Sequence, residues 1–332
     1  MRRCPIRRAL ALALLCAGAC APHARREQAP QAGLARSARV LIDHWGVLHV
    51  EAHSLPDLYF AWGYATARDR LWQLARLREA ADGQLWRWLG NATLRADGGA
   101  QLFELRAHAE RAWAAQRSDP AAAMPLERYA AGINAYLARC RSGQAPWPAE
   151  LAALGVQPED WRPSDSVLLL LGEGVLLDLD LPELAEAQEI AAHGREWAMR
   201  RRRFESRWIY DTIPDSAAAR LYGGHAAAPA AAQPEARGEP DPALPGLSET
   251  RAALEAWRGP GASDPDQRAS NVFAVGARRS ASGIPLLAND THLPLGVPGP
   301  VHAIHVTVPG RVNAIGFYVP GIPAIVSGRN ER

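Results

Sequence analysis

Apolar residues recur every three or four positions through the first half of the chain, which is the period of one face of an α-helix. The clearest run begins after Ser54, where Asp57 three residues later completes a helix-start signal. Its apolar positions are Phe60, Tyr64, Leu71, Leu74 and Leu77. Before this run, alternating residues on either side of Trp45 and Gly46 predict a short hairpin over residues 38–52.

Further segments with helical spacing follow, separated by glycine and proline residues. We expect helices near residues 126–139, 164–177 and 182–208. Between Pro214 and Gly246 there is almost no large apolar residue, and such a segment cannot bury enough surface to order itself. We therefore interpret residues 38–213 as a mainly helical region and residues 214–269 as a linker.

From Ser270 onward the pattern changes to strands. Apolar residues gather in short runs over 271–277, 285–288, 301–308 and 312–318, with glycine and proline turns between them. The run over 301–308 is nearly continuous, which favours a strand covered on both faces. The chain is therefore expected to have an α+β fold, with helices first and strands after the linker.

Residues 1–19 have the pattern of a secretory signal peptide. A basic start is followed by a short apolar stretch, and Ala17, Gly18 and Ala19 offer a cleavage site. Cys20 directly afterwards leaves open the alternative of a lipid-anchored protein. We expect a periplasmic or secreted protein, with residues 20–37 as a flexible tether.

Composition removes several classes of function. The formal charge is +2 over 332 residues without a long basic block, so nucleic acid is a poor partner. Three of the four cysteines lie at or before position 20, which leaves Cys140 alone and predicts no disulfide framework. The motifs of common zinc, nucleotide and α/β-hydrolase sites do not occur.

Ser270 stands where the linker changes to strand sequence. A serine there becomes a capable nucleophile if the chain is cut just before it. The freed α-amino group has a pKa close to neutral and can act as the base for the adjacent hydroxyl. The ordinary alternative is a serine that merely starts a strand, and the surrounding residues favour the nucleophile.

Those residues form a motif that resembles the start of the catalytic chain in the penicillin acylase family of N-terminal-nucleophile hydrolases. It reads Ser270-Asn271-Val272-Phe273 and then Pro285-Leu286-Leu287-Ala288-Asn289-Asp290-Thr291-His292-Leu293. The blocks 43–50, 57–74, 130–137 and 161–165 resemble the smaller chain of the same family. The resemblance covers most of residues 38–210 and 268–332. Two positions depart from it, because Ala269 stands where glycine is usual and Phe273 where tryptophan is common.

The resemblance implies an αββα four-layer sandwich, incomplete in this chain, and cleavage between Ala269 and Ser270. The excised spacer would leave an α chain and a β chain, residues 270–332 being the start of the latter, joined as a heterodimer. Ser270 would be the catalytic nucleophile, and His292 would hold the region around it in position. Leu293 is expected in the substrate pocket. The family's oxyanion donors would lie beyond Arg332, so we expect a truncated precursor.

The resemblance also implies that the protein could bind a structural calcium ion, although no cofactor is required for the chemistry. Glu183 is the best candidate ligand by position, close to Asp178 and Asp180. The alternative is that these carboxylates form the acidic first turn of a helix after Pro182.

The function implied is that of an exported amidohydrolase acting on a small-molecule acyl amide. It would release an acyl group from a β-lactam nucleus or a homoserine lactone. The alternative from another class is a non-catalytic exported or lipid-anchored binding protein.

Overall fold

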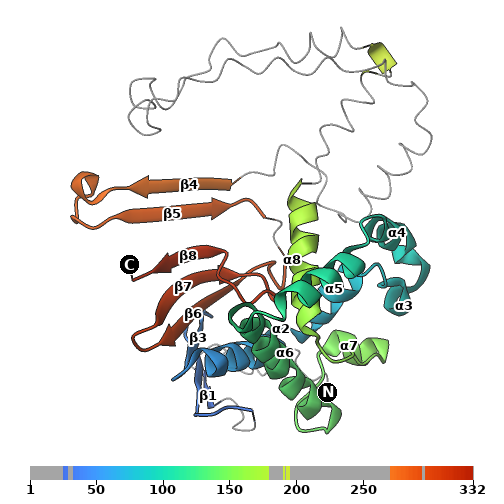
Figure 1. The fold of residues 1–332 in the computed structure, drawn as a ribbon, viewed down its shortest axis with the longest axis horizontal. Helices are drawn as coiled ribbons and strands as arrows, with labels where there is room; N and C mark the ends of the chain where they lie inside the picture. The colour runs from blue at the N-terminus through green and yellow to red at the C-terminus, as the bar shows by residue number, and fades with distance from the viewer. Residues whose placement is uncertain are drawn as a thin grey trace, which may run out of the picture. The chain divides into compact units, whose positions relative to one another are not determined.

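The computed structural model describes residues 25–28, 33–178, 190, 192–194, 270–293 and 296–331. Figure 1 shows their arrangement, with helices beside one large sheet and a separate pair of strands. The elements are β1 Arg25–Gln28, β2 Arg39–Ile42, β3 Leu48–Glu51, α2 Leu55–Ala81, α3 Trp86–Leu89, η1 Gly90–Thr93, α4 Leu94–Leu102, α5 Leu105–Gln116, α6 Pro120–Arg141, α7 Ala149–Leu154, α8 Pro163–Asp178, β4 Ser270–Val275, η3 Ala277–Arg279, β5 Leu286–Thr291, β6 His302–Val308, β7 Val312–Tyr318 and β8 Ser327–Asn330.

The predicted hairpin, the helices predicted at α2, α6 and α8 and the strands predicted at β4 to β7 are confirmed, whereas α3, α4, α5, α7 and β8 were not predicted. β2 and β3 form the hairpin, and Ser54 caps α2, its Oγ accepting the N–H of Asp57 at 3.2 Å. The expected helix over 182–208, the signal segment and the linker over 214–269 lie outside the described residues, apart from residues 190 and 192–194.

β1 differs from expectation because it lies within residues 20–37, where we expected a flexible tether. It pairs antiparallel with β2. Backbone hydrogen bonds make this pairing and need no apolar side chains, so a polar, alanine-rich sequence gives no sign of it.

The large sheet has six strands in the order β1-β2-β3-β6-β7-β8. β3 and β6 pair parallel, with Leu48 opposite Ile304 and His49 opposite His305, and all other neighbours pair antiparallel. The two histidines are 256 positions apart along the chain. Segments from before and after the linker therefore share one sheet.

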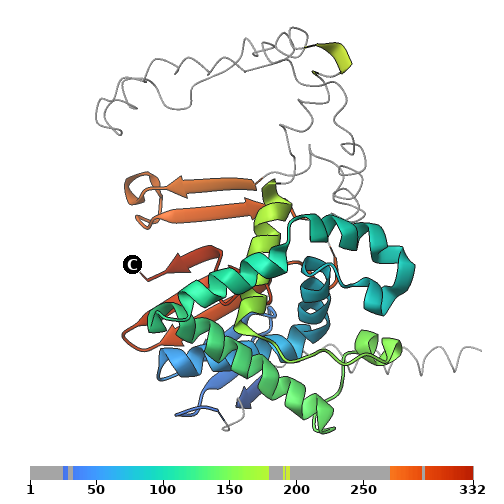
Figure 2. The ribbon, with the colours of Figure 1, turned by 45° about the vertical axis from the view of Figure 1, so that its right-hand side comes forward.

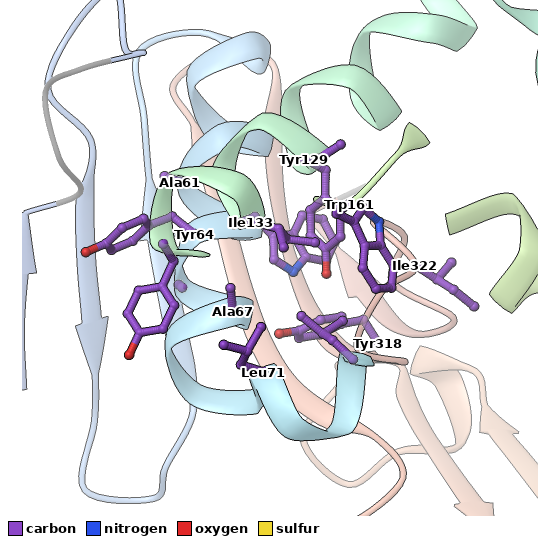
Figure 3. Close-up of a cluster of buried hydrophobic side chains, with 14 of the residues drawn as sticks. Ala61, Tyr64, Ala67, Leu71, Tyr129, Ile133, Trp161, Tyr318 and Ile322 are labelled. Carbon is purple, nitrogen blue, oxygen red and sulfur yellow. The ribbon is translucent and has the colours of Figure 1, made fainter. Parts of the chain in front are cut away.

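The core lies where α2 packs against the buried face of this sheet and α6 packs against α2 (Figure 2). Figure 3 shows Tyr64 and Leu71 of α2, Ile133 of α6 and Tyr318 of β7 in this core. The buried residues of the sheet include Val40, Leu48, Val50, His302, Ile304, Val306, Val308 and Tyr318. These apolar faces supply most of the driving force for folding this part of the chain.

α2 and α6 approach each other at two glycines. A Cβ atom at Gly63 would overlap the carbonyl oxygen of Tyr129, and one at Gly132 would overlap the carbonyl oxygen of Phe60. The two backbones can lie this close only because neither position carries a side chain.

The expectation that residues 301–308 would be covered on both faces is wrong for the described structure. Exposure alternates along β6, with His302, Ile304, Val306 and Val308 buried and the residues between them half-buried. The half-buried face carries Ala303, His305 and Thr307, which are small or polar. β6 therefore follows the alternating pattern of a strand with one packed face.

Cys140 is buried, and it forms no disulfide with another described residue. None of the described helices is long and apolar enough to cross a membrane.

Candidate active site

Ser270 is the first residue of β4, at the open end of the two-stranded sheet. Its Cα partner in β5 is Thr291, the last residue of that strand. Every residue of β5 is exposed, and β4 is exposed apart from a half-buried Val275. The antiparallel pairing therefore brings Ser270 beside the segment that contains His292, on an accessible part of the molecule.

The imidazole of His292 belongs to a small polar cluster. Its Nε2 lies 3.0 Å from Asp290 Oδ2 and 3.3 Å from the side-chain nitrogen of Asn271. A carboxylate only accepts hydrogen bonds, so Nε2 carries a proton and donates it to Asp290. The side-chain nitrogen of Asn271 is also a donor, so its 3.3 Å contact with the protonated Nε2 is a close approach and not a hydrogen bond.

Strand alternation separates this cluster from the serine side chain. Successive residues of a strand point to opposite faces, and directly paired residues share a face. Asn271 and Asp290 are paired, so they lie on one face, while Ser270 and Thr291 lie on the other. Among the hydrogen bonds of the described residues none joins His292 to Ser270, which is consistent with this placement. The structure places Ser270 opposite Thr291, the residue before His292, but forms no hydrogen bond between the side chains of Ser270 and His292.

The remaining predicted site residues are placed only in part. Leu293 is partly exposed, and its N–H donates to the carbonyl oxygen of Thr291 at 3.0 Å. Ala269, Asp180 and Glu183 lie outside the described residues, as does the side chain of Asp178. Within the described ranges no group of three or more His, Cys, Asp or Glu side chains could hold a metal ion. The calcium site therefore stays a prediction.

A cavity that the sequence analysis missed lies beside α2 and β6, with a volume of about 670 Å³. It is lined by α2 residues 68–73, by the segment around Trp147 and by residues 296–299 and His302. None of Ser270, His292 and Leu293 lines it. One signal could have found it, because His302 is a polar residue at a position that the alternation of β6 assigns to the buried face.

Comparison with known proteins agrees with the motifs around Ser270. The penicillin amidase family model matches residues 37–332, so the chain belongs to that family. Its mixed helix and sheet architecture is the α+β class expected for an N-terminal-nucleophile hydrolase.

Among its relatives is the acyl-homoserine lactone acylase QuiP of Pseudomonas aeruginosa, 31% identical over 305 residues, which are 91% of this chain and 33% of QuiP. Penicillin acylase 2 proenzyme of Pseudomonas sp. is 33% identical over 267 residues, 80% of this chain and 31% of that protein. The chain thus spans about one third of the length of these curated relatives. A solved structure of a thermostable penicillin G acylase from Alcaligenes faecalis is 31% identical, covering 55% of this chain and 96% of its own, with a TM-score of 0.43.

Proposed function

We propose that this protein is an exported amide hydrolase that cuts a linear amide through Ser270, after cleavage of the bond between Ala269 and Ser270. The observation that carries the proposal is the place of Ser270. It starts an exposed strand beside the Asn271, Asp290 and His292 cluster, in a chain of the penicillin amidase family. An accessible strand start suits a residue that must become a new chain terminus.

The processing step needs no other reagent than water. Ser270 Oγ attacks the carbonyl carbon of Ala269, the peptide C–N bond breaks, and the nitrogen takes the proton and becomes the free amine. Water then hydrolyses the ester that remains. The name of one relative, a proenzyme, supports processing into an α and a β chain that remain together as a heterodimer.

In turnover the same hydroxyl attacks the carbonyl carbon of the substrate amide. The α-amino group of Ser270 accepts the hydroxyl proton and passes it to the leaving nitrogen as the C–N bond breaks. Water hydrolyses the acyl-enzyme and releases the acid. His292 is a positioning residue in this proposal, because its imidazole contacts Asn271 and not the serine hydroxyl.

The proposed substrates are an acyl-homoserine lactone or the acyl amide of a β-lactam nucleus. The names of the relatives support both, and the histidine at position 292 favours an aliphatic acyl group or a lactone. The signal segment 1–19 supports a periplasmic or secreted location, with lipidation of Cys20 as the alternative. A structural calcium ion held by Glu183 is part of the same proposal.

Turnover of matched substrates by the processed protein tests the activity. An acyl-homoserine lactone, a penicillin and a cephalosporin are offered to the complete precursor, because the oxyanion donors implied by the resemblance lie beyond Arg332, and to its Ser270→Ala variant. We expect release of the free amine by the wild-type protein only. His292→Gln should still be processed and keep measurable turnover, whereas complete loss in a folded, processed His292→Gln protein would mean that the base is wrongly assigned. An unprocessed protein without turnover would favour the non-catalytic binding protein.

A further inference from the structure

The cavity described above contains a histidine whose protonation the fold dictates. Thr66 Oγ1 donates its only proton to the carbonyl oxygen of Trp62, at 2.8 Å. The hydroxyl of Tyr318, 2.9 Å from Thr66 Oγ1, must therefore be the donor in that pair. With its proton used, the Tyr318 oxygen can only accept from His302 Nδ1 at 3.1 Å. This chain of hydrogen bonds places a proton on Nδ1 of His302.

The other ring nitrogen of His302 is then a free acceptor. Burial, reinforced by the charge of Arg70, lowers the pKa of His302 to about 4, so the ring is neutral at physiological pH. A neutral ring with a proton on Nδ1 has an unprotonated Nε2. Nε2 has no hydrogen-bond partner among the described residues, although His302 is only 8% exposed. Nε2 is not one of the fully buried side-chain atoms, so it is accessible from the cavity, where water or a ligand can supply a donor.

Arg70 supplies a matching donor in the same cavity. It lies where α2 kinks, with φ −138° and ψ 22°, and its guanidinium contacts Gln73 Oε1 at 3.5 Å. Gln73 is itself anchored, because its side-chain nitrogen donates to the carbonyl oxygens of Gly299 and Pro300. Within the described part of the chain Arg70 forms no ion pair, whereas its neighbour Arg68 is paired with Asp69 at 2.7 Å. Most of the donors of Arg70 are therefore available.

Apolar side chains complete the cavity. Trp72 and Trp147 line it together with Leu71 and Val297. A volume of about 670 Å³ is within the usual range for a small-molecule site, and such sites combine apolar walls with a few fixed polar groups.

We propose that this cavity binds a small organic acid that carries a hydroxyl or N–H group beside its carboxylate and an apolar chain or ring. The carboxylate pairs with Arg70, the adjacent donor bonds to Nε2 of His302, and the apolar part packs against Trp72 and Trp147. Because Ser270 and His292 do not line the cavity, this is a second site. It does not depend on the proposed hydrolysis.

Calorimetric titration with three related probes tests the two polar contacts separately. 2-Hydroxyhexanoate has both groups, hexanoate lacks the hydroxyl and 2-hydroxyhexanamide lacks the charge. We expect 2-hydroxyhexanoate to bind at least about tenfold more tightly than either of the other two probes. A change of this size in the dissociation constant is expected for one hydrogen bond to a charged or buried group. Hexylamine tests the opposite charge preference, because Asp69 and Glu150 also line the cavity.

Matched variants connect the binding to these residues. His302→Asn keeps a donor for Tyr318 but removes the Nε2 acceptor, and Arg70→Met removes the charge, so each should weaken binding of 2-hydroxyhexanoate about tenfold or more. The control is Arg95→Met, at an exposed arginine outside the cavity, and it should bind like the wild-type protein. Nitrogen-15 NMR of the histidine rings gives a readout that needs no variant. It should show His302 protonated on Nδ1 alone, with the Nε2 resonance moving when the probe is added.

Several outcomes would overturn the proposal. They are an absence of saturable binding at millimolar probe, equal binding of hexanoate and 2-hydroxyhexanoate, tighter binding of hexylamine, or a proton on Nε2 in the free protein. Binding that survives both His302→Asn and Arg70→Met would also place the ligand elsewhere.

Discussion

The core formed by α2, α6 and β6 and the hairpin formed by β4 and β5 differ in how their apolar residues are used. Phe60 of α2, whose ring is covered by Gly33 and Arg128, is 3% exposed, whereas Phe273 in the hairpin is 62% exposed. Val272, Leu286 and Leu287 are also mostly exposed. Side-chain packing therefore holds the core together, while backbone pairing sets the register of the hairpin. The residues proposed to carry the chemistry lie in the region with the least packing.

The same substitution made in both regions tests this difference in packing most directly. Phe60→Ala should lower the free energy of unfolding by about 3–5 kcal/mol, because it empties a packed site. Phe273→Ala in the same chain should change it by less than about 0.5 kcal/mol, because the ring is exposed. Chemical denaturation measures both. Similar costs at the two positions would show that the hairpin is packed as tightly as the core.

Charged residues allow the same kind of test within the helical region. The buried Asp165 accepts from Arg106 Nη1 at 2.6 Å and from the backbone N–H of Arg162 at 2.8 Å. Asp165→Asn should cost about 3 kcal/mol, because the Arg106 guanidinium loses a fully buried carboxylate partner although it keeps its pair with Asp82. Asp160→Asn, which breaks an exposed pair with Arg141, is the control and should cost less than about 1 kcal/mol. A small effect at Asp165 would mean that water reaches this site.

The lowered pKa of His302 predicts how the free energy of unfolding depends on pH. Its pKa is about 4 in the folded protein and about 6.5 when unfolded. Between these values the unfolded state binds more protons, so this residue makes stability fall as pH falls from about 6.5 to about 4, by up to about 3 kcal/mol. Unfolding curves of the wild-type protein and His302→Asn should differ by this slope. Parallel curves would contradict the buried neutral ring.

Substituting a glycine between α2 and α6 should change the free energy of unfolding by a smaller amount. Gly132→Ala should destabilise the protein by about 1–3 kcal/mol, because the new Cβ meets the backbone of Phe60. Gly98→Ala in α4 has open space around it and should be neutral or slightly stabilising. Thermal melts of the two variants compare them, and equal melting temperatures would show that the helices can move apart without cost.

Local patterns made much of the fold predictable. Ser54 and Asp57 marked the start of α2, alternation marked β2 and β3, and a short apolar run marked β7, because caps and strand patterns depend on neighbouring residues. The motif around Ser270 also placed Ser270 and His292 near each other, and the pairing of β4 with β5 agrees.

Features that depend on distant residues could not be predicted. The parallel pairing of β3 with β6 joins segments far apart in sequence, and no local pattern encodes it. The cavity at His302 arises only when α2 and residues 296–299 meet. The opposite faces of Ser270 and His292 likewise follow from strand register and not from the motif.

The central claim is that the chain is cut immediately before Ser270 by Ser270 itself. N-terminal sequencing of the processed catalytic chain, purified with its small chain, tests it most directly. We expect the sequence to begin at Ser270, followed by Asn271, Val272 and Phe273, and we expect Ser270→Ala to remain uncut. A catalytic chain that begins at another residue, or normal cleavage of Ser270→Ala, would contradict this account.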